Sequence, residues 1–168
     1  MIKLLMENWI LMLCCIPPFW LLQNCIHELS HGLTLYPSGC RFRIVPWPSK
    51  YDGKWYFALC YWTKWTNPPN HLVALMCIMP RISNFIFILL SYVLMFYIQN
   101  QYLSAILFVF VVCNLEDFFT GMIPIFHSTP KEETDIWRFL KKTNFSKTTI
   151  RAVGGVLFTL LQLPLWFI

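Results

Sequence analysis

The chain has 168 residues, enough for one domain, and 57% of them are hydrophobic while only 12% are charged. A soluble domain is usually about 25% charged, so the composition excludes an ordinary water-soluble protein and favours one that lipid surrounds. The net charge of +5 does not indicate nucleic-acid binding, because the basic residues flank apolar segments, where topology and lipid headgroups explain them. The seven cysteines are an odd number and lie mostly in apolar runs, so we interpret them as small hydrophobic residues.

Four apolar segments are long enough to cross a bilayer, which takes about 20 helical residues. We expect these segments at 9–35, 71–98, 102–126 and 150–168. Pro17 and Pro18 interrupt the first one, which predicts a short entry segment and then a helix that starts near Pro17. No signal-peptidase site follows this segment, so we expect it to be retained. The predicted fold class is an all-α integral membrane protein, with residues 1–168 forming one membrane-embedded domain.

A different pattern separates the first two apolar segments. Residues 41–45 partly alternate, residues 54–62 are rich in aromatic side chains, and Asp52-Gly53 lies between the two runs. This pattern predicts a small β-hairpin. The hairpin could anchor the chain at the membrane interface, or its open strand edge could pair with an extended peptide, and the two interpretations are compatible.

The basic residues predict the orientation in the membrane. They are concentrated in the segments 36–70 and 127–149, and with four spans both segments fall on the same side. The positive-inside rule places them in the cytoplasm and both termini outside. We therefore predict a multi-pass protein of the plasma (inner) membrane whose two large loops are cytoplasmic.

Residues His27-Glu28-Leu29-Ser30-His31 form an H-E-x-x-H motif near the end of the first apolar segment. Residues four apart share a helix face, so His27 and His31 can bind the same metal ion. Glu28 is close enough to act as a general base on a metal-bound water. The alternative is a chance pattern, in which neighbouring helices satisfy the two histidines.

A catalytic zinc site usually has three protein ligands and one open position, so a third His, Asp or Glu is needed. Geometry leaves several candidates on the same side of the membrane: His71, Glu116, Asp117, His127, Glu132, Glu133 and Asp135. Asp117 has a competing role, because Arg81 lies at a depth where the two could form an ion pair between the second and third spans. We favour this ion pair over metal binding by Asp117. His71 and His127 lie at predicted helix ends, a position more typical of interface residues.

The chain resembles the site-2 protease family of intramembrane zinc metalloproteases. That family places H-E-x-x-H in a membrane helix, follows it with a small β-rich segment and supplies an aspartate from a later helix. The nearest match to the aspartate motif is Thr120-Gly121-Met122-Ile123-Pro124 followed by Asp135-Ile136-Trp137-Arg138. The resemblance implies that Asp135 is the third ligand to Zn²⁺, with Asp117 as the alternative. Asn114 is one candidate for stabilising the oxyanion.

By this resemblance the protein is a zinc metalloendopeptidase that cleaves transmembrane or membrane-proximal peptides, with Glu28 as the base. The substrate must be locally unwound, because a helix hides its carbonyl groups. The first alternative is a catalytically inactive relative that acts as a binding or regulatory module; the presence of Glu28 argues against it. The second is a metal-handling or structural membrane protein without hydrolytic activity. The sequence does not predict an oligomeric state.

Overall fold

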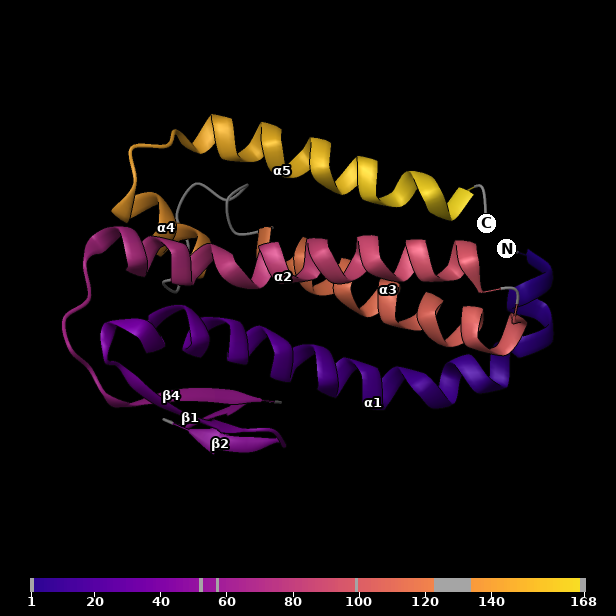
Figure 1. The fold of residues 1–168 in the computed structure, drawn as a ribbon, viewed down its shortest axis with the longest axis horizontal. Helices are drawn as coiled ribbons and strands as arrows, with labels where there is room; N and C mark the ends of the chain where they lie inside the picture. Colours follow the sequence, from indigo (N-terminus) through magenta and orange to yellow (C-terminus); the bar gives the residue numbers. More distant parts are fainter. Residues whose placement is uncertain (1, 52, 57, 99, 123–133, 167–168) are drawn as a thin grey trace.

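The computed structural model describes residues 2–51, 53–56, 58–98, 100–122 and 134–166 (Figure 1). Four helices are long and apolar enough to cross a membrane. They are α1 (Ile2–Leu35), α2 (Asn70–Tyr97), α3 (Gln101–Met122) and α5 (Lys147–Gln162), which continues into the 3₁₀ turn Leu163–Trp166. The predicted fold class, a multi-pass helical membrane protein with four spans, is confirmed.

Helix α1 contains Pro17 and Pro18 without a break, so the expected separate entry segment is wrong. Each proline removes one backbone N–H from the helix. A full break inside the hydrocarbon would leave several backbone groups without water or protein partners, which costs more than two missing donors. The apolar surroundings therefore favour one continuous helix.

Helices α1 and α3 run in the same direction, and α2 runs antiparallel to both (Figure 1). These three helices contact one another, while α5 packs on α3 and α2 from the opposite side to α1 (Figure 1). One buried cluster, which includes Cys77, Phe118 and Ile136, joins α2, α3 and α4 near the hairpin. The outward face of α1 exposes large apolar side chains such as Leu13 and Leu22, as a helix in contact with lipid should.

The predicted hairpin is present as two consecutive two-stranded segments. Strand β1 (Arg41–Val45) pairs antiparallel with β4 (Leu59–Lys64), and β2 (Ser49–Tyr51) pairs with β3 (Lys54–Tyr56). Pro46 and Pro48 lie between β1 and β2, where they cannot donate to a ladder. The hairpin packs closely on α1 at Gly32. The ring of Phe42 lies so near that a Cβ atom at this position would overlap it.

A short helix, α4 (Asp135–Lys142), lies in the segment that we expected to be a loop. Its Ile136 and Phe139 are buried in the cluster that includes α2 and α3. Helix α4 and the hairpin lie at the same end of the spans, and the first turns of α1 and the end of α5 lie at the other (Figure 1). The segments 36–70 and 127–149 were expected on the same side, and the hairpin and α4, which belong to them, do lie at the same end of the bundle (Figure 1). The cytoplasmic location of this end stays a prediction.

Candidate metal centre

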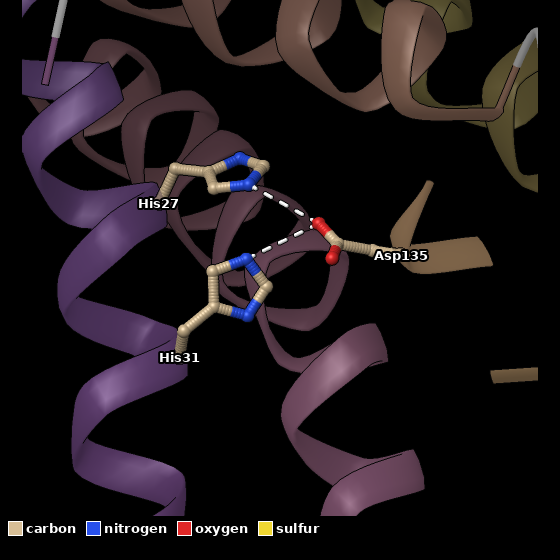
Figure 2. A group of neighbouring side chains, drawn as sticks. All are labelled: His27, His31 and Asp135. Atoms are coloured by element: carbon tan, nitrogen blue, oxygen red, sulfur yellow. Dashed lines mark ion pairs between the residues drawn. The ribbon is translucent and has the colours of Figure 1, made fainter. Parts of the chain in front are cut away.

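Two histidines and one aspartate from distant parts of the chain meet at the hairpin end of the bundle. His27 and His31 project from successive turns of α1, and Asp135, the first residue of α4, points between them (Figure 2). Asp135 Oδ2 lies 3.6 Å from His27 Nε2 and 3.2 Å from His31 Nε2. One ligand atom from each residue lies within 4.8 Å of the other two. The donor set, two imidazoles and one carboxylate, suits zinc.

The other nitrogen of each imidazole is held by an acceptor. His27 Nδ1 lies 3.0 Å from Asp117 Oδ2, and His31 Nδ1 lies 2.9 Å from the carbonyl oxygen of Met76. A carboxylate and a carbonyl only accept, so each Nδ1 carries the proton. In a neutral imidazole the lone pair is then on Nε2, which faces Asp135. Metal-binding histidines are commonly oriented in this way, through an Nδ1–H bond to a carboxylate or a backbone carbonyl.

Asp117 is part of a buried polar network between α1, α2 and α3. Arg81 Nη1 donates to Asp117 Oδ2 at 2.7 Å and to the Asp117 carbonyl at 2.6 Å, and Asn84 Nδ2 donates to Oδ2 at 2.6 Å. The predicted ion pair is therefore confirmed. Gly121 makes room for it, since a Cβ atom there would overlap the Arg81 guanidinium. Asp117 bonds the Nδ1 side of His27, away from Asp135, a position from which it orients the ring.

Glu28 faces a cavity beside the two histidines. Its Oε2 accepts a hydrogen bond of 3.1 Å from the backbone N–H of Cys60 in β4. The cavity has a volume of about 260 Å³, many times the ~10–15 Å³ that one water molecule needs. Its lining residues come from α1, the hairpin, α2 and α4: His27, Glu28, His31, Tyr56, Cys60, Trp62, Met76, Asp135 and Arg138.

The charge of Asp135 is fixed by its neighbours. Burial alone would raise the pKa of this carboxyl group, but the imidazoles of His27 and His31 beside it outweigh burial and hold the pKa well below its usual range. Asp135 is therefore an anion across the physiological pH range. A carboxylate must be deprotonated to bind a metal, so the site meets this requirement.

The other candidates lie elsewhere. His71 is exposed in the first turn of α2, and Glu116 is exposed on α3. Asn114 is fully buried and donates to the Phe110 carbonyl of its own helix; it does not line the cavity, so the suggested oxyanion role is wrong. The remaining candidates lie outside the described residues: His127, Glu132 and Glu133.

Sequence reasoning missed the groups that orient the site. The Cys60 N–H and the Met76 carbonyl are backbone groups, and no side-chain pattern predicts them. Asn84 does carry a signal, because it is a polar residue one turn from Arg81 in an apolar segment. Comparison with protein-family models, with curated proteins and with solved structures finds no match for this chain, so any assignment of function depends on the geometry of the site.

Proposed function

We propose that this protein is an integral membrane zinc metallopeptidase that hydrolyses transmembrane or membrane-proximal peptides. One observation carries the proposal. Both Nδ1 atoms are engaged by acceptors, both Nε2 atoms face Asp135, and Glu28 lines the same cavity. A pair of histidines that merely satisfied neighbouring helices would not need a third ligand and a carboxylate base beside it.

His27, His31 and Asp135 would hold the metal and leave a position open toward the cavity. When bound, zinc would polarise a carbonyl group and lower the pKa of water toward ~7. Two histidines and one carboxylate are also a ligand set for non-haem iron, so the metal is part of the test.

Glu28 is the proposed general base. It takes a proton from the water that attacks the peptide carbonyl carbon, and it delivers that proton to the leaving nitrogen as the C–N bond breaks. The Cys60 N–H fixes one carboxylate oxygen of Glu28. Tyr56 and Arg138 line the cavity and carry hydrogen-bond donors, so we assign to them the stabilisation of the oxyanion in place of Asn114.

The hairpin offers a way to bind an extended substrate. Strand β4 pairs with β1 along one edge, and the Cys60 N–H on its other edge donates to Glu28. The open edge of β4 therefore faces the proposed base. A peptide that added to this edge would be extended, with its carbonyl groups accessible. A transmembrane substrate would have to unwind at this point, because helical carbonyls are already bonded.

The test is metal content, followed by cleavage. The purified wild-type protein should contain about one zinc per chain by elemental analysis, and His27→Ala should lose it. Glu28→Gln should keep the zinc but lose cleavage of a panel of membrane-segment peptides. Zinc without cleavage in the wild type would favour the inactive binding module. Absence of zinc or iron from the wild type, even after the metals are supplied, would refute the proposal.

A further inference from the structure

Three amide side chains are buried inside the spans, one turn further from the hairpin than the metal ligands. Gln23 on α1, Asn84 on α2 and Asn114 on α3 are 1%, 0% and 0% exposed. They are too deep for bulk water, so each polar atom needs a partner from within the protein.

The orientation of the first two amides is fixed by Asp117. Its carboxylate only accepts, so the nitrogen of Asn84 must face it, at 2.6 Å. The oxygen of Asn84 then accepts from Gln23 Nε2 at 3.0 Å. This chain of bonds leaves Gln23 Oε1 at its end, and that oxygen is buried without a partner among the described residues.

The side-chain oxygen of Asn114 also lacks a hydrogen-bond donor, for a separate reason. Its nitrogen donates to the Phe110 carbonyl at 2.8 Å, and that carbonyl cannot donate back. The Asn114 Oδ1 atom is therefore a second acceptor, also buried and without a partner in the described part of the chain. A flip of the Asn114 amide would place two acceptors against each other, so the orientation is not free.

The two unpaired oxygens belong to residues at the same level of the α1–α3 interface. These helices run in the same direction (Figure 1). The rings of Phe19 and Phe110 lie 5.5 Å apart, and His27 Nδ1 lies 3.0 Å from Asp117. Gln23 lies one turn from both Phe19 and His27 on α1. Asn114 likewise lies about one turn from both Phe110 and Asp117 on α3. Two acceptors cannot bond to each other, so this level of the interface requires a donor.

We propose that Gln23, Asn84 and Asn114 form a binding site for a single buried water molecule. Water donates two hydrogen bonds, one for each unpaired oxygen. The second hydrogen of one amide nitrogen can donate a third bond to it, which gives the ~3 bonds of a typical buried water. A metal cation fits less well, because hard cations take about six or more oxygen ligands and Arg81 is close to the cluster. The water completes a chain through Gln23, Asn84 and Asp117 to His27, so it helps to orient that imidazole whether or not a metal binds.

A pair of matched substitutions tests the site through the melting temperature in detergent. Asn24 Nδ2 donates to the Trp20 carbonyl, the same local bond that Asn114 makes, so Asn24→Leu is the control for Asn114→Leu. If water bridges the oxygens, Asn114→Leu displaces it and melts about 2–10 °C below Asn24→Leu. If nothing binds there, Asn114→Leu removes an unsatisfied acceptor and melts at or above the control, which would overturn the proposal.

Infrared spectra in H₂¹⁶O and H₂¹⁸O provide a direct readout. The wild type and Asn24→Leu should share an isotope-sensitive O–H band that Asn114→Leu lacks; its persistence in Asn114→Leu would refute the site. Asn114→Ser replaces the leucine variant if the latter does not fold. Exchange of sodium for choline should leave the melting temperature unchanged, and a sodium-specific rise that depends on Asn114 would assign the site to a cation instead.

Discussion

The ion pair between Arg81 and Asp117 links α2 to α3, and its removal should be costly. Arg81 is 8% exposed, and its guanidinium donates to both the carboxylate and the backbone carbonyl of Asp117. Loss of one partner from a buried pair typically costs about 3–5 kcal/mol, because the other charge stays buried. His27 and Asn84 still contact the carboxylate in Arg81→Met, so we expect a loss of about 3 kcal/mol in the free energy of unfolding.

The double variant Arg81→Met/Asp117→Asn distinguishes the cost of an unpaired buried charge from the cost of lost packing. It removes both charges but keeps an amide oxygen at residue 117 that can still accept from Asn84 or His27, so it should be more stable than Arg81→Met by at least about 1 kcal/mol. Unfolding by SDS titration, followed by tryptophan fluorescence, measures the stability of both variants. The control is Arg43→Met at an exposed position, which should stay within about 0.5 kcal/mol of wild type. A loss below about 1 kcal/mol in Arg81→Met, or a double variant less stable than the single one, would refute the reasoning.

Three further predictions concern the site and the orientation of the chain. Asp117→Asn should lower the affinity for zinc by about 10–100-fold, while Asp135→Ala should abolish binding in a chelator competition; the opposite order would make Asp117 the ligand. Burial, with a smaller effect from the charge of Glu28, raises the pKa of the Cys60 thiol to about 12, so alkylation of Cys60 followed by mass spectrometry should be slow at pH 7 and accelerate as the pH rises toward that value. Rapid labelling at pH 7 would contradict this microenvironment. A cysteine at Ser49 should react with a membrane-impermeant reagent only from the cytoplasmic side, and reaction from outside would reverse the predicted topology.

The fold was predictable where local rules decide it. The length of each apolar run sets the four spans, and Asp52-Gly53 between two strand-like runs sets the hairpin. The continuity of α1 through Pro17 and Pro18 was not predictable from proline rules that apply in water. The cost of a chain break depends on the solvent around it, and lipid reverses the usual outcome.

The candidate site was predictable only in part for a similar reason. His27, Glu28 and His31 are placed together by one helix, so their spacing is sufficient. The Arg81–Asp117 pair followed from the cost of a lone charge in a membrane. Asp135 needed a resemblance to separate it from six other candidates, because its position depends on how α4 packs, and residue types alone do not specify that.

The candidate metal centre therefore depends on two helices: α1, and the short helix α4, which must pack in the right position on the bundle. Helix α1 carries His27, Glu28 and His31, which line the same cavity. Helix α4 carries Asp135 and is held on the bundle by buried Ile136 and Phe139 and by a 2.9 Å hydrogen bond from Lys142 to Asn70. A metal that binds residues of both helices favours the docked position of α4. Because this coupling is reciprocal, any interaction that stabilises the docked position must strengthen metal binding by the same free energy. The packing of a short surface helix is then as much a determinant of the site as the H-E-x-x-H motif itself.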